Sequence, residues 1–468
     1  MPLHPDRLFP IEPSARRVAR ELYEAVKDLP IISPHGHTEP RWYAENEAFP
    51  DPVSLFVRPD HYIFRMLFSQ GISLEALGIP DRNGEVKNTD NRAIWRLFAG
   101  NWHLFRGTPS RAWLEHSFET LFGITERLSE KNADAIYDTI AAALETPAFR
   151  PRALYEKFRI EAISTTDSAL DSLNWHDQIR ESGWQGRVLP AYRPDAVIDP
   201  DRGRDQFAER VAQLCDLAGT PVSWDGYLEA HRIRRQYFIA RGATSTDHGH
   251  PTARTADLSR DDAAALFDRL LAGPITADDA ELFRAQMLTE MARMSLDDGL
   301  VMQLHPGAFR SHNPWLFEHY GPDKGADIPT PTNYVHALKP LLDAVGTDPR
   351  LTLILFTLDE TTFSRELAPL AGYYPALRLG PPWWFFDSFE GMRRFREAAT
   401  ETAGFYNTVG FNDDTRAFLS IPARHDVARR VDAGYLAQLV TDHRLELDEA
   451  HELARDLAYG LAKKAYKL

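Results

Sequence analysis

Eight short apolar runs, each followed at once by polar residues, restrict how this chain can fold more than any other feature. They occupy residues 30–33, 160–164, 187–191, 243–246, 300–304, 351–357, 376–379 and 406–411. Aliphatic runs of this length are typical of buried strands. Segments with helical periodicity lie between several of them, including 225–241, 278–294, 333–345 and 391–402. Strand and helix alternating eight times predict an α/β protein with a (β/α)8 TIM barrel.

Two long helical stretches distort this simple alternation. About 120 residues separate the first two runs, and their helical, aromatic-rich patterns predict an α-helical insertion at 39–157 that covers the barrel mouth. Residues 1–38 and 158–468 then form the metal-dependent barrel. A second helical excursion, about 206–299, flanks the fourth run, and residues 424–468 predict two C-terminal helices on the barrel exterior.

Charge and cysteine content narrow the possible partners and compartment. The formal net charge of −15 disfavours nucleic acid or an anionic membrane surface as a partner, since both need clustered positive charge. The single cysteine, Cys215, excludes an intrachain disulfide and a cysteine-based zinc site. The N-terminal segment lacks a hydrophobic signal core, which favours a cytoplasmic protein without a membrane span.

The sharpest chemical signal is the pair His35 and His37, directly after the first run. Residues i and i+2 of a strand share a face, so both imidazoles can point to one spot inside a barrel. Neutral imidazole is a common ligand for zinc and related divalent ions. An HxH motif alone is weak, because a surface or core role explains many such pairs, but its position here favours a metal site.

Asp414, at the end of the last run, is the predicted carboxylate partner of the two histidines. It can complete a metal site and act as a general base. We prefer Asp414 to its neighbour Asp413, which we expect in a structural salt bridge or in solvent, because Arg416 then shares the face of Asp414. His305, at the end of the fifth run, is a candidate to bind metal or substrate; a core histidine is the structural alternative.

The absence of lysine between Lys157 and Lys324 narrows the chemistry of the site. A two-metal hydrolase with a carbamylated lysine needs a lysine on a central strand, and a Schiff-base aldolase uses one as well. Both classes are disfavoured. A single divalent metal in the active site is the consistent prediction.

Polar and aromatic residues near other strand ends suit a small anionic substrate. Arg193 ends the third run, where its planar guanidinium can hold a carboxylate. Asp247 ends the fourth run and can bind sugar hydroxyls or simply cap a turn. Tyr62 and Arg65 lie in the insertion. They either belong to a lid over the substrate or simply pack inside the insertion. Trp383, beside Trp384, offers an apolar face to sugar C–H groups, although core packing accounts for one of the two tryptophans.

Taken together, the motifs resemble those of the uronate isomerase family, a branch of the amidohydrolase superfamily. The ordered set spans almost the whole chain: PIISPHGH, DHYIFRML, ISTTDSALDSL, RVLPAYRPD, STDH, VMQLHPGAFRSHN, PPWWF and GFNDDTRAFLSIPARHD. The resemblance implies interconversion of D-glucuronate with D-fructuronate and of D-galacturonate with D-tagaturonate. It implies one divalent metal, commonly zinc, on His35, His37 and Asp414, and a homo-oligomer. The substrate would contact Tyr62, Arg193, Asp247, His305 and Arg416.

For this isomerisation we expect Asp414 to be the base, with Arg416 and Tyr62 polarising the substrate oxygens. Two other functions remain open at this point. The same ligands can activate water for hydrolysis of a lactone or amide of a sugar acid. A catalytically silent sugar-acid binder is the second alternative, although binding alone does not require a carboxylate beside a metal.

Overall fold

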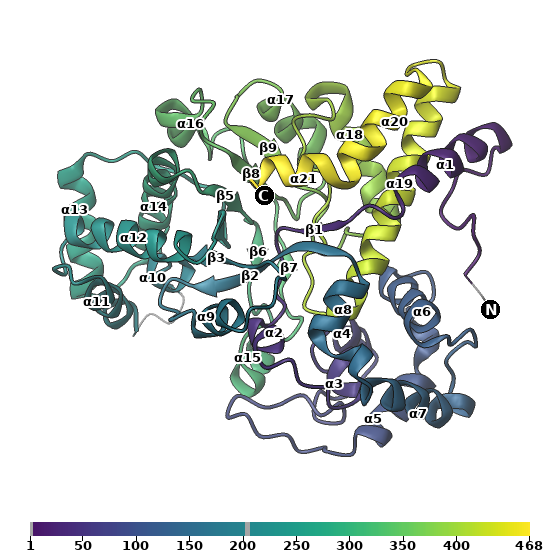
Figure 1. The fold of residues 1–468 in the computed structure, drawn as a ribbon. Coiled ribbons are helices and arrows are strands. Elements are labelled where there is room, and N and C mark those ends of the chain that lie inside the picture. Colours follow the sequence, from purple (N-terminus) through teal and green to yellow (C-terminus); the bar gives the residue numbers. More distant parts are fainter. Residues whose placement is uncertain (1–2, 202–205) are drawn as a thin grey trace.

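A parallel sheet of seven strands forms the centre of the protein. The structure, a computed structural model, describes residues 3–201 and 206–468 (Figure 1). The strands are paired in their order along the chain: β1 (Ile31–Ser33), β2 (Ile160–Ser168), β3 (Val188–Arg193), β4 (Ser245–His248), β5 (Val301–Leu304), β8 (Leu353–Leu355) and β9 (Leu377–Leu379). All neighbouring pairs are parallel. Seven of the eight predicted strands are therefore present, with boundaries shifted by a few residues.

The eighth predicted strand, 406–411, is wrong as a continuous strand. Among the described residues it forms a single parallel bridge, between Thr408 and Leu379. The backbone turns at Gly410, whose φ is +75° and whose Cβ position would lie 2.8 Å from the carbonyl oxygen of Leu457; a left-handed residue of this kind interrupts a strand. The ends of the sheet still approach each other, because the His37 amide donates to the Thr415 carbonyl at 3.0 Å.

Helices fill the predicted insertion. They are α2 (Pro40–Glu45), α3 (Pro52–Phe56), α4 (His61–Ser69), α5 (Asn91–Gly100), α6 (Pro109–Phe122), α7 (Ala133–Leu144) and α8 (Pro151–Lys157). Their apolar faces share a core rich in aromatic residues such as Trp95, Phe98 and Phe118. The Asp60 side chain caps α4 by accepting a hydrogen bond from the Tyr62 amide, which fixes where the Tyr62 side chain begins.

The other predicted helices are present with small changes. The second excursion contains α11 (Phe207–Ala218), α12 (Trp224–Ile239), α13 (Arg260–Ala272) and α14 (Ala277–Asp298); its first residue, Gln206, is the helix cap of α11. The segment predicted at 333–345 becomes helical only at α16 (Lys339–Val345), which has a proline in its first turn, where proline is best tolerated. The helix predicted at 391–402 is α18 (Phe389–Ala403). A two-stranded antiparallel ribbon, β6 (Ala308–Phe309) with β7 (Ile328–Pro329), was not predicted.

Helices from the two ends of the described chain pack together beside the sheet. The apolar faces of α1 (Pro13–Val26), α19 (Ile421–Thr441) and α20 (Leu447–Arg455) share one buried cluster, and Figure 1 shows purple α1 beside yellow α19. The second predicted C-terminal helix continues from α20 through a π-helical turn, Asp456–Gly460, into α21 (Leu461–Ala465). Arg429 of α19 donates to the carbonyls of Lys27, Leu29 and Pro30, directly before β1. No helix in residues 3–201 and 206–468 is both long and apolar enough to cross a bilayer.

Candidate active site

His35 and His37 lie in the loop that follows β1 and point toward the same carboxylate. Their Nε2 atoms lie 3.4 and 3.2 Å from Oδ1 of Asp414, and their ring centroids are 5.3 Å apart. β1 ends at Ser33, so the two histidines follow the strand instead of belonging to it. The predicted convergence of the pair with Asp414 is nevertheless what the structure shows.

Asp414 holds its carboxylate in the cavity through an unusual backbone conformation. Its φ is +39°, in the left-handed region that few non-glycine residues adopt. Burial raises the pKa of Asp414, but the neighbouring imidazoles of His35, His37 and His305 lower it more, so the net pKa is well below its usual value. Asp414 is therefore ionised at neutral pH. Asp413 points elsewhere, as predicted, and its Oδ2 lies 3.1 Å from Nε2 of His425.

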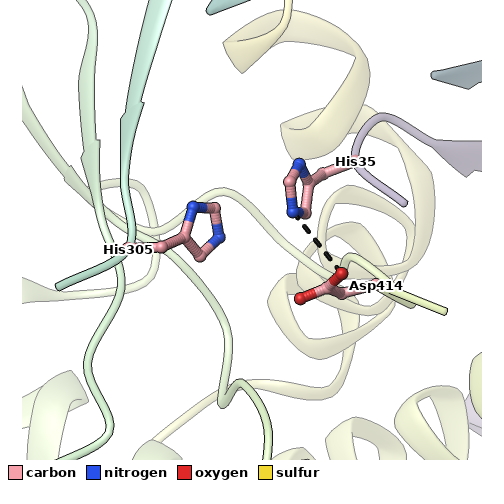
Figure 2. Close-up of side chains that lie close together, drawn as sticks. All are labelled: His35, His305 and Asp414. Carbon is pink, nitrogen blue, oxygen red and sulfur yellow. Dashed lines mark ion pairs between the residues drawn. The ribbon is translucent and has the colours of Figure 1, made fainter. Parts of the chain in front are cut away.

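His305 completes a cluster with His35 and Asp414 (Figure 2). Its ring stacks on His35 with a centroid distance of 4.5 Å, and its Nδ1 lies 2.7 Å from Oδ1 of Asp247. Nε2 of His305 is buried and has no hydrogen-bond partner within the described parts of the chain. Trp383 meets the His305 ring edge-on at 4.7 Å.

The buried carboxylate of Asp247 forms an ion pair with the half-buried Arg193 next to this cluster. Nη1 of Arg193 lies 3.2 Å from Oδ2 of Asp247, and its Nε donates to Asp195 at 2.8 Å. Burial raises the pKa of Asp247, but the charge of Arg193 and the hydrogen bond from His305 outweigh that effect and hold the pKa well below its usual value. Both predicted residues thus line the same cavity as the histidines.

Tyr62 contacts a charged pair that the sequence analysis did not find. Its hydroxyl donates to Oδ1 of Asp387 at 2.9 Å, and Arg424 donates to Oδ2 of the same carboxylate at 2.8 Å. The Arg424 guanidinium lies 3.6 Å from the ring centre of Trp113. Arg424 lies in the SIPARHD segment, one of the motifs that resemble the family, and this motif could have indicated it. No sequence pattern indicates Asp387, because it follows an irregular loop.

The remaining predicted residues differ in how they meet the cavity. Arg416 and Trp383 line it, as does Trp384. Nη2 of Arg416 lies 3.5 Å from Asp323, and the Arg416 side chain is 40% exposed. Arg65 does not line the cavity; its guanidinium lies over the rings of Tyr62 and Phe385, at 5.6 and 4.9 Å. Lining residues that were missed include Asp60, His61, Arg310, Asp323 and Asp327.

The donor atoms of the cluster suit a divalent metal. One donor atom from each of His35, His305 and Asp414 lies within 4.8 Å of the other two, and His37 adds a third imidazole beside the carboxylate. The unpaired Nε2 of His305 is a further indication, since buried polar atoms ordinarily have a partner. Imidazoles with one carboxylate are ligands that zinc and neighbouring ions prefer.

Comparison with known proteins decides the family. A family model described as "Glucuronate isomerase" matches residues 14–466. The chain belongs to the glucuronate isomerase family. A curated "Uronate isomerase" of Brucella canis is 69% identical over 468 residues, covering all of both chains. The crystal structure of glucuronate isomerase from Caulobacter crescentus superposes with a TM-score of 0.98 at 62% identity, covering 100% of this chain and 97% of that one.

Membership in this family confirms the uronate isomerase interpretation of the sequence, and nothing in the comparisons favours the hydrolase alternative. A putative metal-dependent hydrolase from Lactobacillus casei shares the fold, with a TM-score of 0.52 at 13% identity over 95% of this chain and 97% of that one. The geometry of the cavity can therefore be related to the isomerase activity of this family.

Proposed function

We propose that this glucuronate isomerase family member interconverts D-glucuronate with D-fructuronate and D-galacturonate with D-tagaturonate. The observation that carries the proposal is the convergence of Asp414, three imidazoles and two arginines, Arg193 and Arg416, on one cavity. A hexuronate presents a carboxylate and several hydroxyls. Arginines suit the carboxylate, and buried carboxylates such as Asp247 suit the hydroxyls.

A single divalent ion, which we propose to be Zn²⁺, would be held by His35, His37 and Asp414, with His305 as the fourth group. Asp247 accepts the Nδ1 hydrogen of His305, which leaves the lone pair of Nε2 facing the cluster. Burial lowers the pKa of His37 and of His305, so both are neutral and able to donate a lone pair. When bound, the ion would supply positive charge that orients and polarises substrate oxygens.

The reaction moves one proton between neighbouring carbons. Asp414, ionised and half-buried, would take the proton from C2 of the aldose and return it to C1. In the first half the C2–H electron pair forms the C1–C2 double bond of an enediol, and the C1 carbonyl oxygen gains a proton. In the second half the C2 hydroxyl loses its proton and becomes the carbonyl, and the double-bond pair takes up the proton at C1. Tyr62 and Arg416 would stabilise the charge that develops on these oxygens.

The surrounding residues would keep this chemistry productive. Arg193 would bind the substrate carboxylate, and the ion pairs with Asp195 and Asp247 would hold the Arg193 guanidinium in place. Trp383 would pack against the C–H face of the sugar. Arg65 would support the site indirectly, through its contact with the Tyr62 ring. Enclosure by α4 and the 381–387 segment would exclude water from the enediol.

A direct assay tests the proposal. The purified protein is incubated with D-glucuronate or D-galacturonate in D₂O, with and without a chelator, and proton NMR follows the ketose and the label at C1. We expect ketose product that depends on metal. Release of acid from a uronolactone without ketose formation would instead support the hydrolase, and tight binding of uronate without any product would support a binder.

We also propose the finer architecture expected from the sequence. Residues 1–38 and 158–468 would form one barrel domain, in which the irregular segment after β9 closes the ring without a continuous strand, and residues 39–157 would form the domain over its mouth. The bridge of Thr408 to Leu379 and the hydrogen bond from His37 to Thr415 support closure. Sedimentation velocity would test the predicted homo-oligomer.

A further inference from the structure

A second HxH motif begins at the last residue of β4. It consists of His248, Gly249 and His250, and it lies beside Asp195, which follows β3. Side chains alternate along a strand, so His248 faces away from the cavity into which Asp247 points. His248, His250 and Asp195 are 0%, 3% and 2% exposed, and none of the three is among the described residues that line the active-site cavity.

The two histidines of this motif are buried without adequate hydrogen bonding. Both ring nitrogens of His250, and Nδ1 of His248, have no hydrogen-bond partner in the part of the chain that the structure describes. Nε2 of His248 lies 3.0 Å from the Thr246 hydroxyl, so only that nitrogen is satisfied. Buried polar atoms ordinarily have partners, and an imidazole with two unpaired nitrogens needs an explanation.

The positions of the donor atoms supply that explanation. One donor atom each from Asp195, His248 and His250 lies within 4.8 Å of the other two. Imidazole nitrogens and a carboxylate oxygen are ligands that divalent metals commonly accept in proteins. Charged groups surround His250: the carboxylates of Asp195, Asp199 and Glu281, and the guanidinium of Arg284.

We propose that Asp195, His248 and His250 form a second divalent-cation site, separate from the catalytic cluster. Two imidazoles and a carboxylate suit Zn²⁺, Co²⁺ or Ni²⁺ better than Mg²⁺ or Ca²⁺, which prefer oxygen ligands. Because the site is closed to the cavity, its role is structural.

The proposed site contacts Arg193, the residue proposed to hold the substrate carboxylate. Asp195 accepts hydrogen bonds from Nε of Arg193 at 2.8 Å and from the Gly249 amide at 3.2 Å. The loop packs tightly there, since a Cβ on Gly249 would lie 2.5 Å from Nη2 of Arg193 and 3.0 Å from Oδ2 of Asp195. A cation on Asp195 would therefore fix the carboxylate that orients Arg193, and its ligands act as positioning residues.

Counting bound metal tests the proposal independently of any isomerase activity. Full-length protein is stripped with chelator and dialysed against Co²⁺ or Zn²⁺, and bound metal is measured by mass spectrometry of the elements. We expect two equivalents in the parent protein, one in His35→Asn, one in His250→Asn and none in the double variant. His443→Asn is the matched control, because His443 is exposed and has a left-handed φ of 55°, which asparagine tolerates; it should retain two.

Each alternative result is decisive. If His35→Asn binds no metal while the parent binds one equivalent, the second site does not exist, and buried water would satisfy the histidines. If His250→Asn lowers thermal stability without changing the metal count, the role of the pair is packing alone and the proposal is wrong. If His250→Asn does not fold, the number of metal equivalents bound by His35→Asn still shows whether the second site exists. A kinetic measurement with a uronate as substrate rests on the proposed function. In it we expect His250→Asn to raise KM about tenfold and to change kcat less.

Discussion

His305 donates its Nδ1 hydrogen to Oδ1 of Asp247 across 2.7 Å. Since the pKa of Asp247 is held well below its usual value, the carboxylate is ionised and accepts this hydrogen bond. The bond fixes the tautomer of His305 and directs the lone pair of Nε2 toward His35 and Asp414. Asp247 therefore prepares a ligand of the cluster besides pairing with Arg193.

Removing this carboxylate should weaken the catalytic metal site. We expect Asp247→Ala to lower the affinity of the protein for Zn²⁺ by about 10- to 100-fold, as is typical when a partner of a ligating histidine is lost. Competition with a chromogenic chelator measures the affinity. Asp323→Ala is the control, because Asp323 also lines the cavity but contacts the solvent-exposed side chain of Arg416. Equal affinities in the two variants would contradict the role of Asp247.

Asp414→Asn should abolish most turnover while leaving the fold intact. Asparagine tolerates the left-handed backbone at this position, but its amide cannot accept the substrate proton, so kcat should fall by about 10²- to 10⁴-fold. The neighbouring variant Asp413→Ala should behave differently. It leaves buried His425 without its partner, so its main effect should be a loss of unfolding free energy of about 1–3 kcal/mol. Full activity in Asp414→Asn would assign the base elsewhere.

Tyr62→Phe should reduce catalysis with little loss of stability. The ring and its packing remain, and Arg424 still pairs with Asp387, but the hydroxyl that donates to Asp387 is gone. We expect kcat to fall by about 10²-fold, the usual cost of one polarising donor. Tyr155→Phe is the control, because that hydroxyl contacts only the backbone of Arg187 among the described hydrogen bonds. A Tyr62→Phe enzyme as active as Tyr155→Phe would exclude Tyr62 from the reaction.

A buried carboxyl away from the cavity predicts a pH-dependent stability. Burial raises the pKa of Asp167 to about 7, and the side chain accepts a hydrogen bond from Thr165. An acid with a raised pKa in the folded state reduces stability as the pH rises from the unfolded value, near 4, to the folded value, and the cost is constant above that. Asp167→Asn removes this cost but keeps the hydrogen bond.

The variant should therefore gain stability relative to the parent protein between pH 4 and pH 7, by a few kcal/mol in total. Urea unfolding at several pH values measures the difference. Both proteins are compared in a His176→Gln background, because the pKa of His176, which burial lowers to about 4, contributes in the opposite direction and its Nε2 lies 3.8 Å from Oδ2 of Asp167. A difference that does not change with pH would show that Asp167 titrates normally.

Much of the site could be predicted because strand ends obey a simple rule. In a parallel barrel the side chains that follow each strand gather at one end, so His35, Arg193, Asp247, His305 and Asp414 could be grouped before any coordinates. Alternation of side chains along the chain also directed Asp413 away from the site, toward a salt bridge or solvent. The rule for strand ends needs only their positions, which apolar runs indicate well.

Residues in irregular segments could not be predicted in this way. Asp387 follows a loop in which Trp384 and Phe385 both have positive φ, a conformation that no sequence periodicity reveals. Its contact with Arg424 depends on how that loop meets α19, which is a tertiary property. The eighth strand was overpredicted for a related reason, since Val409 and Phe411 are buried without a strand ladder, which Gly410 interrupts.

The hydrogen bonds of Arg429 to the segment before β1 have a consequence for folding. Arg429 and Lys27 are 402 positions apart, and the imidazoles just after β1 meet a carboxylate from the far end of the sheet. Contacts this distant in sequence close large loops and form late. A nascent or truncated chain would thus lack a high-affinity metal pocket, and metal uptake would mark the completion of folding.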